Sequence, residues 1–305
     1  MSIRLKPHSQ RATNAFLRRS AVLLGLFVLV SNVGFALAQG LRDPTLLRTS
    51  LNVSEFPRQV DLFISLRESW LIPGFAIAML VFIVLALGHF FAIGPKDMSA
   101  RDERDLIPWW NLFERIVHLV MLVTFVILAI SGLAVTFGRY LGGGTPGLLL
   151  RHTHEYSGFV FTVFLVILFL MWVRHAIPRS YDLAWFSKMG GYLGYKGALK
   201  SDKFNAGQKV WYWIVVLAGI LLAYSGLMEF FGVGTVLQRR TDVMIHFFAA
   251  IPIILMFLVH LYLTTIGTKG AFMGMVNGRI SKTAAQQLHS EAPELRRAQP
   301  AGSDD

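Results

Sequence analysis

The chain has 305 residues, 54% of them hydrophobic, and a mean hydropathy of +0.53. It is too apolar for an ordinary soluble domain, because several stretches reach the roughly 20 residues that cross a bilayer as a helix. It has no cysteine, which excludes disulfides, cysteine-ligated iron–sulfur clusters, thiolate zinc sites and a covalently attached c-type haem. The net charge of +11 lies largely between the apolar stretches, so we interpret it as a signal of membrane topology rather than of nucleic-acid binding.

The first 38 residues have the features of a signal peptide. Their basic residues, which no acidic residue accompanies, are Arg4, Lys6, Arg11, Arg18 and Arg19. An apolar run from Ala21 to Val33 follows, and Ala36-Leu37-Ala38 fits a small-residue cleavage site. We expect residues 1–38 to be a cleaved signal peptide and residues 39–72 to be an exported polar segment. The alternative is an uncleaved anchor helix, which would raise the number of spans from five to six.

Five apolar stretches are predicted to span the membrane as helices. They cover residues 73–94, 112–138, 154–175, 209–231 and 244–267. The connector 176–208 and the segment after the last stretch are both basic, and both fall on the inner side if residues 39–72 are exported. The sequence therefore predicts a multi-pass protein of the bacterial inner (cytoplasmic) membrane with a cytoplasmic C-terminus. Its polar tail, residues 286–305, is expected to be disordered.

Histidines within these stretches occur at two predicted depths. His246 and His260 are fourteen residues apart on one helix, so their side chains project from the same face about 21 Å apart. The alternating helix directions place His154 at the outer level with His246, and His118 at the inner level with His260. Ionisable residues inside a span are costly and usually functional, and two neutral imidazoles are good axial ligands for haem iron. We therefore predict two haem b groups, each with its iron held by one of these histidine pairs.

The remaining histidines are interpreted as structural or interfacial. His152 points to a helix face nearly opposite to that of the predicted ligand two residues later. His175 has no partner ligand at its level, and His89 belongs to the additional first span. His8 and His289 lie in polar ends and are set aside.

Short motifs flank the four predicted ligands across residues 108–285. They are Glu114-Arg115-Ile116-Val117-His118, Ser131-Gly132-Leu133, His154-Glu155-Tyr156-Ser157-Gly158, Arg174-His175-Ala176-Ile177-Pro178, Lys203-Phe204-Asn205-Ala206-Gly207-Gln208-Lys209, Lys269-Gly270 and Gly274-Met275-Val276-Asn277-Gly278-Arg279-Ile280-Ser281. In order and spacing this region resembles the cytochrome b (gamma) subunit of membrane-bound respiratory formate dehydrogenase. The resemblance implies an all-α membrane protein: a four-helix di-haem cytochrome b bundle at 108–285, here with an additional N-terminal transmembrane helix at 73–94 and the signal-like segment.

The resemblance also implies a function. The chain would be a membrane anchor that passes electrons through two b haems to membrane quinone, the electron acceptor. Its partners would be an iron–sulfur (beta) subunit and a Mo- or W-containing catalytic (alpha) subunit that oxidises formate, so this chain would hold no catalytic residue for formate oxidation. The family's quinone site maps onto Asn205, Gly207, Gln208 and His260.

The chemistry of this stretch is suited to a quinone. Amide side chains can donate hydrogen bonds to quinone carbonyl oxygens, and a glycine permits close backbone approach. The alternative interpretation of Asn205 is a helix N-cap, and the two roles are compatible.

Two other functions fit the sequence. A cytochrome b subunit of a hydrogenase or thiosulfate reductase complex would differ in its partners and electron donor, and the Asn205–Lys209 stretch favours formate over these. A haem-free transporter or structural anchor, with its histidines as a proton relay, would be colourless, and replacing His246 would leave its spectrum unchanged.

Overall fold

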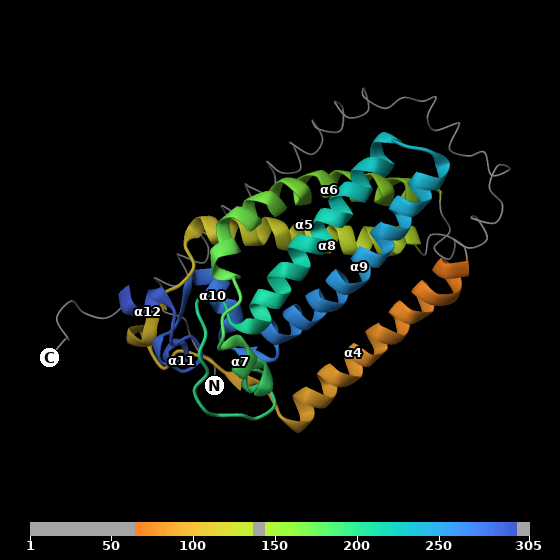
Figure 1. The fold of residues 1–305 in the computed structure, drawn as a ribbon. Helices are drawn as coiled ribbons and strands as arrows, with labels where there is room; N and C mark the ends of the chain where they lie inside the picture. Colours follow the sequence, from red (N-terminus) through yellow and green to blue (C-terminus); the bar gives the residue numbers. More distant parts are fainter. Residues whose placement is uncertain (1–64, 137–143, 298–305) are drawn as a thin grey trace.

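The computed structural model describes residues 65–136 and 144–297 (Figure 1). Among them are five helices long and apolar enough to cross a membrane: α4 (Ile72–Ala92), α5 (Leu112–Thr136), α6 (Gly144–Trp172), α8 (Ala206–Phe231) and α9 (Val236–Thr265). The prediction of a helical membrane protein with five spans in this part of the chain is confirmed. The predicted signal peptide, and the exported segment as far as residue 64, lie outside the described residues.

Two of the spans begin earlier than hydropathy predicts, because a helix can start in polar sequence before it enters the apolar layer. Helix α6 begins at Gly144 rather than residue 154, and α9 begins at Val236 rather than residue 244. Thr235 sets the start of α9 through a capping box. Its hydroxyl accepts a hydrogen bond from the Gln238 backbone N–H, and the Gln238 side-chain oxygen accepts one from the Thr235 backbone N–H. Such reciprocal caps satisfy donors that the first helical turn leaves free.

Four of the spans form the bundle as two helical hairpins. Helix α5 packs along α6, α8 packs along α9, and α6 joins the hairpins through its contact with α8. The core between them is apolar; its most buried members include Val117, Phe161, Leu165, Val216 and Ile253. Helix α4 lies outside the bundle, beside α9 (Figure 1), and buries none of its side chains.

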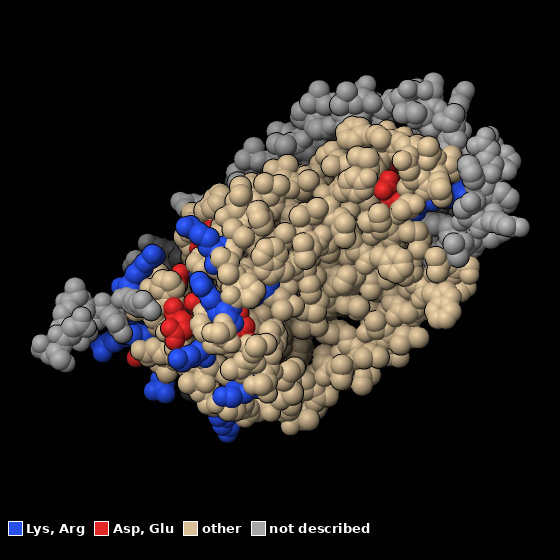
Figure 2. Space-filling model, viewed as in Figure 1, with Lys and Arg blue, Asp and Glu red and all other residues tan. Residues whose placement is uncertain are grey.

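Short elements close one end of the bundle. Strand β1 (Lys96–Asp97) pairs in parallel with β3 (Thr268–Lys269), and β2 (Leu106–Pro108) pairs antiparallel with β4 (Arg279–Ser281). The short helices here are α7 (Asp182–Ser187), α10 (Ala271–Asn277), α11 (Lys282–Leu288) and α12 (Pro293–Arg297). Figure 2 shows most of the visible Lys, Arg, Asp and Glu side chains at this end and an uncharged belt beside it. We call it the charged end.

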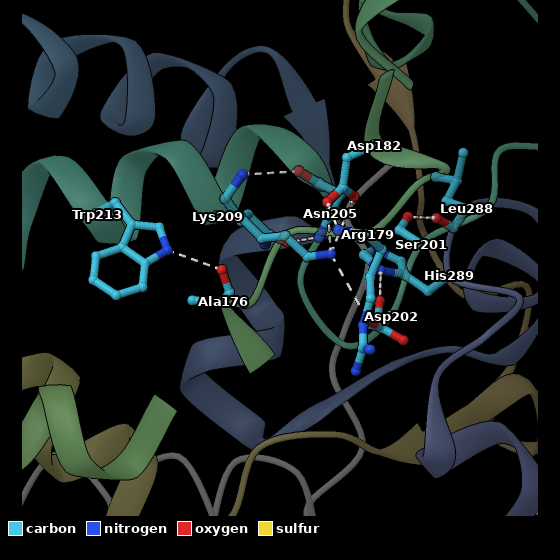
Figure 3. A network of polar contacts seen from close by, with 11 residues as sticks. Ala176, Arg179, Asp182, Ser201, Asp202, Asn205, Lys209, Trp213, Leu288 and His289 are labelled. Atoms are coloured by element: carbon cyan, nitrogen blue, oxygen red, sulfur yellow. Dashed lines mark hydrogen bonds and ion pairs between the residues drawn. The ribbon is translucent and has the colours of Figure 1, made fainter. Parts of the chain in front are cut away.

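Buried ion pairs hold the charged end together. Lys209, 3% exposed at the start of α8, places its ammonium 3.0 Å from both carboxylate oxygens of Asp182 and 3.7 Å from Asp202 (Figure 3). Glu114 at the start of α5 forms an ion pair with Lys203, in which the carboxylate oxygen lies 2.7 Å from the ammonium nitrogen, and both side chains are buried. Burial of a charge is costly unless it is paired, so these pairs fix the 176–208 connector against the bundle.

The expectation of a disordered tail at 286–305 is corrected as far as residue 297. Helix α12 packs Leu295 against Ile107 and Trp109, and Ala292 is fully buried beside them. Polar composition concealed this packing, because the segment has few apolar residues and these pack against distant parts of the chain: Ala292 and Leu295 against Ile107 and Trp109, and Leu288 in a separate cluster with Trp185.

Candidate functional site

The structure brings the four predicted ligands together as two pairs at two levels of the bundle. His154 on α6 faces His246 on α9 with ring centroids 6.0 Å apart, at the end of the bundle away from the charged end. His118 on α5 faces His260 on α9 with ring centroids 6.3 Å apart, nearer the charged end. We call these the outer pair and the inner pair. Each gap accommodates one metal atom bonded to both rings at the usual metal–imidazole length of about 2 Å.

A serine fixes the protonation of each ring in the outer pair. Ser131 donates its only hydroxyl proton to the Ile127 carbonyl at 2.6 Å, so its oxygen must accept from Nδ1 of His154, which lies 3.0 Å away. Ser225 repeats the arrangement, donating to the Leu221 carbonyl at 2.6 Å and accepting from Nδ1 of His246 at 2.9 Å. Both imidazoles therefore carry their proton on Nδ1, which leaves Nε2 as a free lone pair for a metal.

Each serine opens the same tripeptide, Ser-Gly-Leu, at 131–133 on α5 and at 225–227 on α8. The glycine lets the ring lie directly against the helix backbone. A Cβ at Gly132 would lie 3.0 Å from Cε1 of His154, and one at Gly226 would lie 3.5 Å from Cε1 of His246. The two hairpins thus position their histidines in the same way, through a serine and a glycine on the neighbouring helix; the repeated Ser-Gly-Leu tripeptide is the sequence signal for it.

Aromatic rings surround the inner pair. Trp211 stacks on His260 at 5.5 Å with an interplanar angle of 23°, and Trp172 lies 6.3 Å from His118. The indole N–H of Trp172 donates to Glu114, which ties this ring to the buried ion pair at the start of α5. The inner level is therefore built from large planar side chains, whereas the outer level is built from serines and glycines.

The other histidines in the spans have partners that explain them. His89 on α4 donates Nε2–H to the Tyr192 carbonyl at 2.9 Å and accepts at Nδ1 from the Tyr262 hydroxyl at 2.6 Å. His152 lies 3.2 Å from Glu155, and His175 contacts the ring of Phe204. The structure places none of these rings against another histidine.

The donor set fits haem rather than a bare metal ion. The described residues contain no group of three or more His, Asp or Glu side chains that could hold a metal. Two imidazoles alone leave a first-row metal short of ligands, whereas haem brings four equatorial nitrogens and needs only axial ones. Gly158, one turn after His154, faces open space, since a Cβ there would meet no atom within 4 Å. A flat macrocycle needs such room beside its ligand.

A cavity of about 180 Å³ adjoins the inner pair. His260 forms part of its wall, together with the other three residues that the resemblance assigns to a quinone: Asn205, Gly207 and Gln208. The wall is mostly apolar, as expected for a site that takes a largely apolar ligand with a few polar atoms.

The capping box of α8 orients the two amides of this cavity. Asn205 accepts the Gln208 backbone N–H at its side-chain oxygen (3.0 Å), and Gln208 accepts the Asn205 backbone N–H at its own (2.9 Å). With both oxygens occupied, the NH₂ group of each amide remains a donor without a protein partner among the described residues. The helix-cap and ligand-binding interpretations of Asn205 are therefore compatible in this structure.

Two residues that sequence reasoning did not select also line this cavity, Lys96 and His289. The sequence predicts that His289 lies in a polar end without a function, yet its side chain is 6% exposed and donates Nδ1–H to the Asp202 carbonyl at 2.7 Å (Figure 3). Burial lowers its pKa to about 4, so the ring is neutral at physiological pH. Nothing in the local sequence marks either residue, because only the packing of distant segments brings them to the cavity.

Two basic residues near the inner level, Lys209 and Arg115, are occupied by protein groups. Lys209 is paired with Asp182 and Asp202, and Arg115 donates to the Met275 and Val276 carbonyls. Both side chains therefore contribute to the architecture of the charged end.

Comparisons with known proteins identify a family and several relatives of this chain. Residues 109–278, more than half of the chain, match the family model described as prokaryotic cytochrome b561. The chain is 29% identical to the formate dehydrogenase cytochrome b556(fdo) subunit of Escherichia coli K12, over 61% of this chain and 92% of the relative. It is 28% identical to the nitrate-inducible b556(Fdn) subunit of that strain, over 59% of this chain and 86% of the relative. It is 26% identical to the formate dehydrogenase cytochrome b556 subunit of Haemophilus influenzae, over 57% and 77%.

Proposed function

The chain belongs to the prokaryotic cytochrome b561 family, and on that premise we propose that it is the membrane cytochrome b subunit of a formate dehydrogenase complex. The family implies haem b as a cofactor, and the names of the relatives support formate dehydrogenase. The observation that carries the proposal is the meeting of four histidines as two pairs, at two levels of one bundle.

In this proposal His154 and His246 hold one haem b and His118 and His260 hold a second. Bound there, the two haems supply one-electron transfer between a partner subunit and quinone. The protein's own contribution would be to hold each imidazole in the tautomer that directs Nε2 at the iron. Ser131 and Ser225 would do this in the outer pair by accepting a hydrogen bond from Nδ1–H.

The quinone site in this proposal is the cavity beside His260. The amide NH₂ groups of Asn205 and Gln208 donate hydrogen bonds to the quinone carbonyl oxygens, and Gly207 lets the ring approach the backbone at the start of α8. The cavity shares His260 with the inner pair, so acceptor and inner haem would lie next to one another. Its position at the charged end favours access to protons from the adjoining aqueous phase.

The chain needs partners to carry out the whole reaction. It has no cysteine to bind an iron–sulfur cluster, so electrons from formate would reach it through an iron–sulfur (beta) subunit served by a Mo- or W-containing alpha subunit. We infer from the positive-inside rule that the basic charged end and the C-terminus face the cytoplasm of a cell with an inner membrane, with the outer pair on the opposite side. Electron transfer from the outer to the inner level would then cross most of the membrane.

The donor experiment tests the formate assignment. The haem absorption bands are recorded under anaerobic conditions in membranes that contain the chain with its partner subunits. The proposal expects formate to reduce the bands and added quinone to reoxidise them. Reduction by dihydrogen but not by formate would assign the chain to a hydrogenase complex, and oxidation of reduced bands by thiosulfate would assign it to a thiosulfate reductase. A protein without haem bands would be a transporter or structural anchor.

A further inference from the structure

The segment that follows α4 forms part of the cavity wall, although it lies outside the residues that match the family model. Lys96 and Met98 line the cavity, and the matched residues begin at 109. Two backbone hydrogen bonds hold the segment in place: Lys96 N–H donates to the Gly267 carbonyl at 2.9 Å, and Met98 N–H donates to the Lys269 carbonyl at 3.0 Å. The parallel pairing of β1 with β3 thus fixes Lys96 beside the cavity rather than leaving it on a free loop.

Helix α4 is itself attached to this wall. His89, near the end of α4, bonds both the Tyr262 hydroxyl on α9 and the Tyr192 carbonyl of the 176–208 connector. Tyr192 also lines the cavity. The additional helix therefore ends with two polar anchors at the cavity, although the rest of it buries no side chain.

The ammonium group of Lys96 has unused hydrogen-bonding capacity. It donates to the Gly190 carbonyl at 2.7 Å and lies 5.2 Å from the centre of the Tyr192 ring. An ammonium has three donors, and no carboxylate among the described residues forms an ion pair with this one. Burial lowers the pKa of Lys96 to about 8, so it is still mostly protonated near neutral pH.

A quinone head group can supply a hydrogen-bond acceptor for the free donors of the Lys96 ammonium. It has two carbonyl oxygens on opposite sides of its ring and gains negative charge on them as it is reduced. The Asn205 and Gln208 amides stand on the α8 wall of the cavity, while Lys96 stands on the wall formed by the segment after α4. A fixed cation next to an oxygen that becomes negative stabilises it most where water is scarce.

From this geometry we infer that Lys96 is a quinone-binding residue, which donates an N–H hydrogen bond to one carbonyl oxygen of the head group. Helix α4 and the segment after it are the part of the chain that carries this residue to the site. The inference rests on the proposed quinone function, and adds to it a binding residue from outside the family core.

The test uses the whole complex in detergent with the variants Lys96→Met and Lys96→Arg. The control is Lys269→Met, which removes an exposed positive charge from the paired strand β3 without touching the cavity. A short-chain quinol is added, and the readout is the quinol concentration at which haem reduction is half-maximal. Haem content and reduction by dithionite are measured on the same samples.

We expect Lys96→Met to raise the half-maximal quinol concentration roughly tenfold or more, the loss expected for one hydrogen bond to a charged donor. Lys96→Arg should retain part of the affinity, and Lys269→Met should behave as the unmodified complex. Wild-type affinity in a Lys96→Met complex with normal haem content would overturn the inference. If Lys96→Met loses haem, Lys96→Gln is measured in its place and judged by the same criterion.

The two proposals fail in different ways. Haem reduction by quinol does not involve formate, so a complex that ignores formate but shows the Lys96 effect would refute the formate assignment alone. A complex in which no variant and no unmodified protein exchanges electrons with quinol would refute the quinone function itself.

Discussion

Nδ1 of His154 donates a hydrogen bond to the Ser131 hydroxyl, 3.0 Å away, and the same contact joins His246 to Ser225 at 2.9 Å. Each serine oxygen is free to accept because its own proton goes to a carbonyl one helical turn earlier. In the neutral ring the second nitrogen of each histidine is then unprotonated, which is the state a metal requires. One repeated Ser-Gly device thus prepares both ligands of the outer level.

Replacing Ser225 by alanine should weaken the outer site without unfolding the helix. The His246 ring loses its Nδ1 acceptor, and removal of an outer-shell partner of this kind typically costs about 10–100-fold in metal affinity or activity. The measurements are haem content per chain and the midpoint potential of each haem. Ser187→Ala, in an exposed stretch of α7, is the matched control. An unchanged potential and haem content in Ser225→Ala would contradict the assigned role.

Gly132→Val should displace His154 and reduce the outer site selectively. The added Cβ alone would lie 3.0 Å from Cε1 of the ring, and the branched methyl groups leave little freedom to avoid it. About half of the haem should be lost, and the remaining spectrum should be that of the inner haem. Gly88→Val in α4 is the control, since a Cβ there meets no atom within 4 Å. Full haem content in Gly132→Val would argue against this packing.

Lys209→Met should destabilise the charged end strongly. The change leaves Asp182, 7% exposed, as a buried carboxylate without its partner, a change that costs about 3–5 kcal/mol. Thermal unfolding in detergent should show a lower midpoint, which the additional change Asp182→Asn should partly restore. Lys200→Met removes an exposed lysine nearby and should leave the midpoint unchanged. A midpoint insensitive to Lys209→Met would contradict the burial of this pair.

His289 should make the charged end sensitive to acid. Its pKa falls from 6.5 to about 4 because burial disfavours the charged ring, so between these values the unfolded chain binds more protons than the folded one. The stability from His289 is therefore complete above about pH 6.5 and is lost as the pH falls toward 4. The difference in unfolding midpoint between the unmodified protein and His289→Gln should shrink across this window. A difference that is constant from pH 7 to pH 4.5 would show that the ring does not titrate as inferred.

Hydropathy was sufficient to predict the number of spans and their apolar parts, because a helix in a bilayer must present a continuous apolar run, but it missed the polar starts of α6 and α9. The two histidine levels followed from helical rise alone, since His246 and His260 lie on one helix and the helix directions alternate. Both predictions use only periodicity along the chain, and the structure places the four histidines in the two expected pairs.

The cavity wall could not be predicted in the same way. Lys96 lies beside it because β1 pairs with β3, more than 150 residues later in the chain, and His289 reaches it because α11 and α12 fold back onto the charged end. Neither contact produces a periodic pattern in the sequence from which it could be predicted. The orientation of the two amides also depended on the three-dimensional cap of α8, although the Asn205–Gln208 spacing allowed the cap itself to be anticipated.

The most direct test of the account is a reduced-minus-oxidised visible spectrum of the purified chain, with haem quantified per polypeptide and His246→Ala measured beside it. We expect two low-spin b-type haems in the unmodified chain and loss of the outer one in His246→Ala. A well-folded chain without haem, or one whose spectrum is unchanged by His246→Ala, would contradict it.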